Sequence, residues 1–283
     1  MSEPIRKTYK LYLGGEFVRS ESGRYDPVVD DKGKHLANVC RGSRKDLRDA
    51  VRKAREAQPG WASKTAYLKG QILYRMAEML EGRAAEFEKI LKDEGSTAAA
   101  ARNEVRASID RLVHYAGWTD KYPALVSSVN PVASSYFDFS APEPMGVVGV
   151  VLPDEPSLLG VVTHVAPVIA SGNAAIALLS ETRPIAGLEL AEVFATSDLP
   201  PSVIQLISGH RDELIPHLAR HMDVNAIADA GCNEALATEL QRDAAVNVKR
   251  VRVYQKKREE EAQGLHRITD FVEIKTTWHP MGW

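Results

Sequence analysis

Cys232 is the residue best placed by sequence to do chemistry, because it stands just before a helix that is predicted to begin at Glu234. A helix N-terminus lowers the pKa of a nearby thiol and makes it more reactive. The sequence places no general base beside Cys232, so the alternative is a small packing residue without chemistry. The other cysteine, Cys40, is expected to be a buried apolar residue. Two cysteines so far apart exclude a disulfide framework and a structural zinc site.

Asp154 and Glu155 form the second candidate group, as neighbouring carboxylates after an apolar run. They predict either a cation or paired-carboxylate site, or a solvated loop. His217 and His221 stand four residues apart on a predicted helix, a spacing that can bind zinc. The sequence shows no third ligand for them, so we expect a solvated helix face and predict no metal site.

The elements that must position these residues alternate between strand and helix. Apolar strands are predicted at 144–153, 174–179, 203–207, 226–228 and 248–254, with helices at 157–170, 184–196, 212–221 and 234–246. This alternation is typical of a doubly wound, Rossmann-like α/β fold with a parallel sheet. Ligands of such sheets bind beyond the carboxyl ends of the strands, where the candidate residues fall.

The rest of the chain predicts other layers. Gly14 and Gly15 mark a hairpin, and four amphipathic helices follow at 43–58, 66–81, 84–93 and 103–118, the first ended by Pro59 and Gly60. These helices make an N-terminal helical layer. A short strand is predicted at 136–140. The charged stretch 255–267 predicts a solvated linker, and 268–279 an alternating strand that must join a sheet edge in this chain or in another.

Composition restricts the class of protein. Of the 283 residues 44% are hydrophobic and 26% charged, as in ordinary globular proteins. A net charge of −2 gives no basic field for nucleic acid or an anionic membrane. The longest nearly uncharged run is far shorter than the ~20 residues of a membrane span, and the first residues lack the apolar core of a signal peptide. We therefore expect a soluble cytoplasmic protein.

Several segments, in order, resemble the aldehyde dehydrogenase superfamily. They are Leu-Tyr-Leu-Gly-Gly-Glu-Phe-Val from residue 11, Pro-Met-Gly-Val-Val-Gly-Val-Val-Leu-Pro from 144, Ala-Pro-Val-Ile-Ala-Ser-Gly-Asn from 166, Asp-Leu-Pro-Pro from 198 and Phe-Val-Glu-Ile-Lys-Thr from 271. Residues 130–156 look most like the truncated C-terminal half of the class-16 aldehyde dehydrogenases. The resemblance implies an NAD-binding-type domain over 1–254, with 134–143 in a small antiparallel oligomerisation sheet. It also implies a linker over 255–267 and an oligomerisation strand over 268–283.

The resemblance also implies that the catalytic residues are lost. Family members use a cysteine nucleophile, an oxyanion-binding asparagine and a general-base glutamate. The segment that carries the nucleophile should follow the strand 248–254, where this chain enters the charged stretch. Glu155 takes the place of the asparagine, and a carboxylate repels a developing oxyanion. Tyr254 stands where the strand should end in the glutamate.

NAD(P) binding is implied only in part. The family's ribose-binding lysine is Leu178 here, a glycine of its phosphate loop is Leu236, and Asp154 and Asp229 add negative charge. The remaining cofactor positions are Val151, Leu152, Pro153, Ser180, Glu181, Gly209, Gly231, Cys232 and Glu234.

These features predict a catalytically inactive aldehyde dehydrogenase-like subunit that acts in structure or regulation. It would assemble as a homodimer, with a full-length aldehyde dehydrogenase, or with both. Trp278 and Trp283 either pack locally or anchor this interface. One alternative is an NAD(P)-dependent aldehyde oxidoreductase that uses Cys232 or a nucleophile from a partner. Another is a binding module that uses the remaining cofactor cleft.

Overall fold

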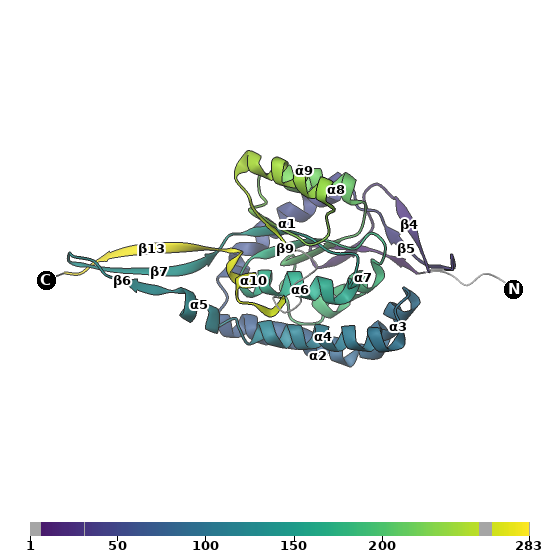
Figure 1. The fold of residues 1–283 in the computed structure, drawn as a ribbon, viewed down its shortest axis with the longest axis horizontal. Helices are drawn as coiled ribbons and strands as arrows, with labels where there is room; N and C mark the ends of the chain where they lie inside the picture. Colours follow the sequence, from purple (N-terminus) through teal and green to yellow (C-terminus); the bar gives the residue numbers. More distant parts are fainter. Residues whose placement is uncertain (1–6, 31, 255–261, 283) are drawn as a thin grey trace.

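The computed structural model describes residues 7–30, 32–254 and 262–282, and a seven-stranded sheet lies at its centre (Figure 1). The strand order is β12-β11-β8-β9-β10-β2-β3. The strands are β2 (Leu11–Leu13), β3 (Glu16–Val18), β8 (Val147–Val151), β9 (Ala174–Leu178), β10 (Ile204–Ile207), β11 (Ala226–Asp229) and β12 (Arg250–Val253). The five from β12 to β10 are parallel, and the predicted Gly14–Gly15 hairpin adds β2 antiparallel to β10. The doubly wound α/β prediction is confirmed.

Helices cover both faces of this sheet (Figure 1). One face carries α1 (Arg44–Ala62), α8 (Arg211–Arg220) and α9 (Glu234–Ala244). The other carries α6 (Ser157–Ala170) and α7 (Ile185–Ala195), with α2 (Ala66–Gly82), α3 (Ala84–Asp93) and α4 (Ala98–Ala116) as an outer layer. Val147 and Val151 of β8 belong to one apolar core, and Val148 and Val150 to the other. Because both faces are covered, the strand is a continuous apolar run.

Two predicted helix boundaries are wrong. α1 continues through Pro59 to Ala62, because the next turn is held by tertiary contacts. In that turn Trp61 is buried and its Nε1 donates to the carbonyl of Ile169 at 2.9 Å. α4 begins at Ala98, five residues before the predicted start, because the hydroxyl of Thr97 caps it by accepting the N–H of Ala100.

The last described strand, β13 (Val272–Pro280), pairs with β7 (Tyr136–Pro144) in this same chain. With β6 (Ser128–Asn130) they form a three-stranded antiparallel sheet, here named the arm, which projects from the body (Figure 1). The tail strand begins at Val272 rather than at 268. Residues 266–269 form α10 (His266–Thr269) instead, since Ile268 is buried in the core.

The predicted linker is only partly within the described residues. Residues 255–261 lie outside them, as does Trp283 of the predicted interface anchor. Ala262 and Arg267 are buried rather than solvated, and the carbonyl of Ala262 accepts the Tyr115 hydroxyl at 2.8 Å. The C-terminal part of the predicted linker is therefore packed against α4.

Several elements were not predicted. β1 (Thr8–Tyr9), β4 (Tyr25–Val29) and β5 (His35–Cys40) form a second three-stranded sheet, in the order β1-β5-β4. The short helices α5 (Lys121–Val126) and η1 (Ala245–Asn247) connect larger elements. Cys40 is buried, as predicted. Within the part of the chain that the structure describes, no helix combines the length and apolarity that a bilayer crossing requires.

Candidate functional site

The predicted site residues all lie at the carboxyl edge of the parallel strands. Val151 ends β8, and the others follow the strands directly: Leu152 and Pro153 after β8, Ser180 and Glu181 after β9, Gly209 after β10, Gly231, Cys232 and Glu234 after β11, and Tyr254 after β12. This follows from the parallel topology, which brings the strand ends to one edge.

An ion pair joins three of these strand ends. The Arg211 guanidinium donates to both carboxylate oxygens of Asp154, each at 2.9 Å, and to the carbonyl of Leu152 at 2.7 Å. The Ser180 hydroxyl donates to Asp154 at 3.0 Å. We call Asp154, Arg211, Ser180 and the Leu152 carbonyl the clasp. Burial raises the pKa of Asp154, but the hydrogen bonds and charge of Arg211 outweigh it and hold that pKa below its ordinary value.

Arg211 was missed from the sequence. It begins α8, and its backbone N–H donates to the Glu181 carboxylate. Its partner Asp154 is 57 residues away in the chain, so no local pattern connects them. The one available hint was its position at the carboxyl end of β10, where ligand-binding side chains of such sheets are found.

The loop after β11 packs tightly against the backbone that follows β8. A Cβ on Gly231 would lie 2.1 Å from the carbonyl oxygen of Leu152, so only glycine fits there. The buried Asp229 carboxylate accepts the N–H groups of Gly231 and Cys232 at 3.2 and 2.9 Å. The loop therefore encloses a carboxylate at the place that the resemblance matches to a phosphate-binding loop.

The surroundings of Cys232 oppose a reactive thiolate. Burial raises its pKa first, and the charge of Asp229 and a hydrogen bond to it raise it further. Arg211 lowers this pKa, but by less. Burial and Asp229 therefore oppose the helix N-terminal effect expected from the sequence, and Cys232 also packs against an apolar core of the sheet.

Glu155 and Tyr254 are also engaged in other contacts. The Glu155 carboxylate is mostly exposed and pairs with Arg183 at 2.9 Å. The Tyr254 hydroxyl donates to Asp270 at 2.8 Å, and its ring lies under the Arg267 guanidinium at 3.8 Å from the ring centre. Burial and then Asp270 raise the pKa of Tyr254, which keeps it protonated.

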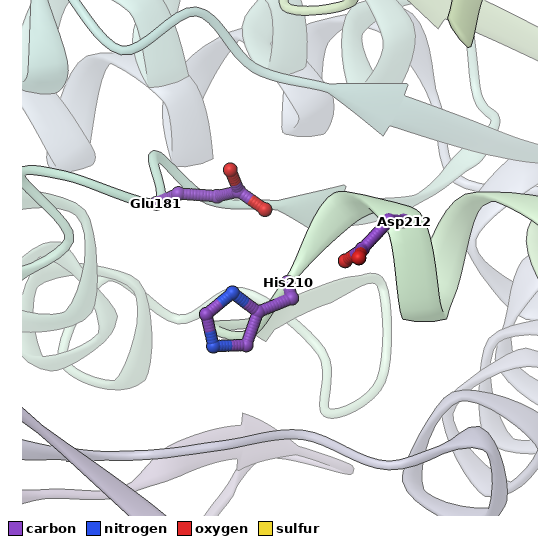
Figure 2. Close-up of side chains that lie close together, drawn as sticks. All are labelled: Glu181, His210 and Asp212. Carbon is purple, nitrogen blue, oxygen red and sulfur yellow. The ribbon is translucent and has the colours of Figure 1, made fainter.

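Glu181, His210 and Asp212 bring one potential ligand atom each to within 4.8 Å of one another (Figure 2). Among the described residues they form the one such set of three or more, and it does not include His217 or His221. Other contacts account for two of the three. Glu181 accepts the N–H that begins α8, and His210 Nε2 lies 3.3 Å from the Asp26 carboxylate. We assign no metal to this set.

Comparison with known proteins supports one family. Residues 17–254 match the model of the aldehyde dehydrogenase family. The chain is 29% identical over 245 residues to an aldehyde dehydrogenase of Aspergillus niger, covering 85% of this chain and 48% of that protein. It is 30% identical over 254 residues to the mitochondrial benzaldehyde dehydrogenase of Antirrhinum majus, covering 88% and 47%. It is 26% identical over 252 residues to the omega-crystallin of Enteroctopus dofleini, covering 87% and 50%.

Solved structures support the same family. An NAD-dependent aldehyde dehydrogenase of Sinorhizobium meliloti superposes with a TM-score of 0.83 at 26% identity, covering 89% of this chain and 50% of that one. PnpE of Pseudomonas sp. WBC-3 gives a TM-score of 0.83 at 25% identity, covering 87% and 50%. The chain spans about half the length of the curated relatives it matches. It belongs to the aldehyde dehydrogenase family.

Proposed function

We propose that this chain is a catalytically inactive aldehyde dehydrogenase-like subunit, with a structural or regulatory role through assembly. Its partner is a second copy, a full-length aldehyde dehydrogenase, or both. The observation that carries the proposal is the clasp. Asp154 and Arg211 pair with each other at the edge of the sheet at which ligands of doubly wound folds bind, so the guanidinium is already engaged there.

The catalytic positions support inactivity. Glu155 stands where the resemblance expects an oxyanion-binding amide, and it pairs with Arg183. Tyr254 stands near the expected base, but it donates its proton to Asp270. Only residues 254–271 separate β12 from β13, too few to hold a second folded domain.

The sheet edge also fits a dinucleotide poorly. Pyrophosphate needs N–H groups and positive charge, which a glycine-rich helix N-terminus supplies. Here Asp229 already accepts the N–H groups of Gly231 and Cys232, and Asp154 already occupies Arg211. These residues do not fit NAD(P), and we derive no reaction step through it.

The arm supports assembly. β13 is a nine-residue strand at the edge of its sheet, and edge strands are the usual sites of β-sheet addition. Ile274, Trp278 and Tyr136 lie on one face of the arm, where directly opposed residues share a face. All three are exposed, and the rings of Tyr136 and Trp278 pack edge-on with centres 5.9 Å apart. Exposed aromatic side chains of this kind are typical interface anchors.

The test is the mass of the pure chain by light scattering, alone and mixed with a full-length aldehyde dehydrogenase from the same source. We expect twice the chain mass of 31.1 kDa, or a mixed complex. The double variant Ile274→Lys/Trp278→Lys should dissociate either complex. Tyr67→Lys, at an exposed aromatic residue on α2 outside the arm, should not. A monomer that ignores the enzyme would overturn the assembly part of the proposal.

Aldehyde oxidation by the pure chain, followed as NADH formation, tests the inactivity part. We expect no rate above background with NAD or NADP. A rate that Cys232→Ala abolishes would instead support the oxidoreductase alternative. A different ligand that stabilises the fold, and with which NAD(P) does not compete, would instead support the binding-module alternative.

A further inference from the structure

Three exposed apolar side chains lie at the amino-end edge of the parallel strands, opposite the clasp. Met222 precedes β11, and Val246 and Val248 precede the neighbouring strand β12; their exposed fractions are 68%, 75% and 90%. The two loops touch, because the Asn247 side chain donates to the carbonyl of Met222 at 3.3 Å. The helices before them, α8 and α9, also pack against each other (Figure 1). We call Met222, Val246 and Val248 the apolar tip.

The backbone of Val248 is strained. Val248 ends the short helix η1 with a φ of 57°, in the left-handed region, and its N–H donates to the carbonyl of Ala245 at 3.2 Å. Glycine or asparagine usually occupies this helix-ending position, because a β-branched side chain is strained there. Packing recovers little of this cost, since the side chain is almost fully exposed. Strain of this kind is typically retained where a residue has a function.

Basic side chains flank the apolar tip. Arg220 ends α8 and Arg242 lies in the last turn of α9, and their side chains are 62% and 70% exposed. The Nε atoms of both face the buried carboxylate of Asp243, at 2.9 and 3.9 Å. One carboxylate balances only one of the two guanidinium charges, so the ends of these helices keep a positive charge.

The basic surface continues onto α1. Four arginines of this helix recur at intervals of three or four residues: Arg44, Arg48, Arg52 and Arg55. At about 100° per residue, they lie within about 80° of one another around the helix axis. Arg55 donates to the backbone carbonyl of Asp223, in the loop that follows α8. Asp49, which Arg48 and Arg52 share, and the exposed Asp223 offset only part of this charge. The excess is local, since the whole chain has a net charge of −2.

We propose that the apolar tip and the basic surface around it dock on an anionic lipid bilayer. A bilayer accepts several separate aliphatic side chains at the depth of its headgroups, and its anionic lipids attract the flanking arginines. Nucleic acid would supply phosphate charge but no apolar layer for Met222, Val246 and Val248, so the apolar tip favours lipid. The contact is peripheral and requires no helix that crosses the bilayer. It lies outside the clasp and the arm, so it depends on neither.

The test is sedimentation of the full chain with vesicles of phosphatidylglycerol and phosphatidylcholine in equal parts, at low ionic strength. We expect binding that pure phosphatidylcholine vesicles do not support and that about 1 M salt removes, because salt screens the charged headgroups. Arg242→Glu should weaken this binding at least about fivefold. Arg106→Glu is the matched control, since Arg106 is an exposed arginine of α4 in the opposite helical layer, and it should bind as wild type does.

A second variant separates docking from folding. Val248→Gly relieves the left-handed strain, so its Tm should not fall below that of wild type. It should nevertheless bind the anionic vesicles about fivefold more weakly, because an apolar side chain that enters the bilayer is lost. Met222→Asp should also weaken binding, whereas Tyr74→Asp, at an exposed residue of α2, should not.

Four results would overturn the proposal: no binding to the anionic vesicles, equal binding to the neutral vesicles, unchanged binding in Val248→Gly, or an equal loss in Arg106→Glu. Retention on immobilised duplex DNA without any vesicle binding would also overturn it, and would assign the basic surface to a polyanion instead. None of these results depends on the assembly or the activity of the chain.

Discussion

Replacing Asp154 by asparagine removes the charge that faces Arg211 but keeps the shape of the side chain. The Arg211 side chain is 9% exposed and that of Asp154 is 36% exposed, so the pair is partly screened by solvent. Leaving one charge of a fully buried pair uncompensated costs about 3–5 kcal/mol. Because Asp154 is partly solvated, we expect a smaller loss for Asp154→Asn, about 2 kcal/mol of unfolding free energy.

The assay is urea unfolding followed by circular dichroism at 25 °C. A double-mutant cycle with Arg211→Gln should give a coupling energy well above the ~0.5 kcal/mol of independent sites. Glu78→Gln, which breaks an exposed pair with Arg75, is the control and should change stability by less than about 0.5 kcal/mol. A coupling energy within the error of zero would refute the clasp as a stabilising contact.

The pH dependence gives an independent check. The folded pKa of Asp154 is depressed, so its contribution to stability is present above the unfolded pKa and is lost as pH falls through the folded value. The stability difference between wild type and Asp154→Asn should therefore be constant near neutrality and shrink below about pH 4. A difference that instead grows in acid would contradict this assignment.

Three further outcomes are expected. Burial raises the pKa of Glu94 to about 7, above its ordinary 4.5. The free energy of unfolding should therefore fall as pH rises between these two values, by up to about 1.4 kcal/mol per pH unit. Glu94→Gln should remove that slope in urea titrations, and an unchanged slope would contradict the raised pKa. Burial and Asp229 raise the pKa of Cys232. Iodoacetamide at pH 8 should therefore label Cys232 at least about tenfold more slowly than free cysteine, as measured by peptide mass spectrometry. An equal labelling rate would count against the raised pKa. Gly231→Ala brings its Cβ against a backbone carbonyl and should cost about 1–3 kcal/mol, whereas Gly82→Ala, which has open space, should cost nothing.

Much of the fold could be predicted from local pattern. The helix 157–170 and the buried strands 174–179 and 203–207 appear within a residue of their predicted limits, because long apolar runs and turn residues mark them clearly. The boundaries that failed depend on distant contacts. Trp61 holds α1 past Pro59 by bonding to Ile169, and burial of Ile268 turns the predicted start of the tail strand into a helical turn.

The candidate site was only partly predictable. Its place at the carboxyl edge of the sheet follows from topology, so Ser180, Glu181 and Gly231 could be located from the sequence. Arg211 could not, since its partner Asp154 is distant in the chain. The roles assigned to the cofactor positions remain predictions.

The sequence by itself determined the family and the alternating order of the main strands and helices, because composition, periodicity and motifs are local properties. The tertiary structure alone decided what the candidate site residues contact. It brought Arg211 to Asp154 and enclosed Asp229 in its own loop. Two charged side chains interact strongly only when folding brings them within a few ångströms of each other, where water no longer screens them.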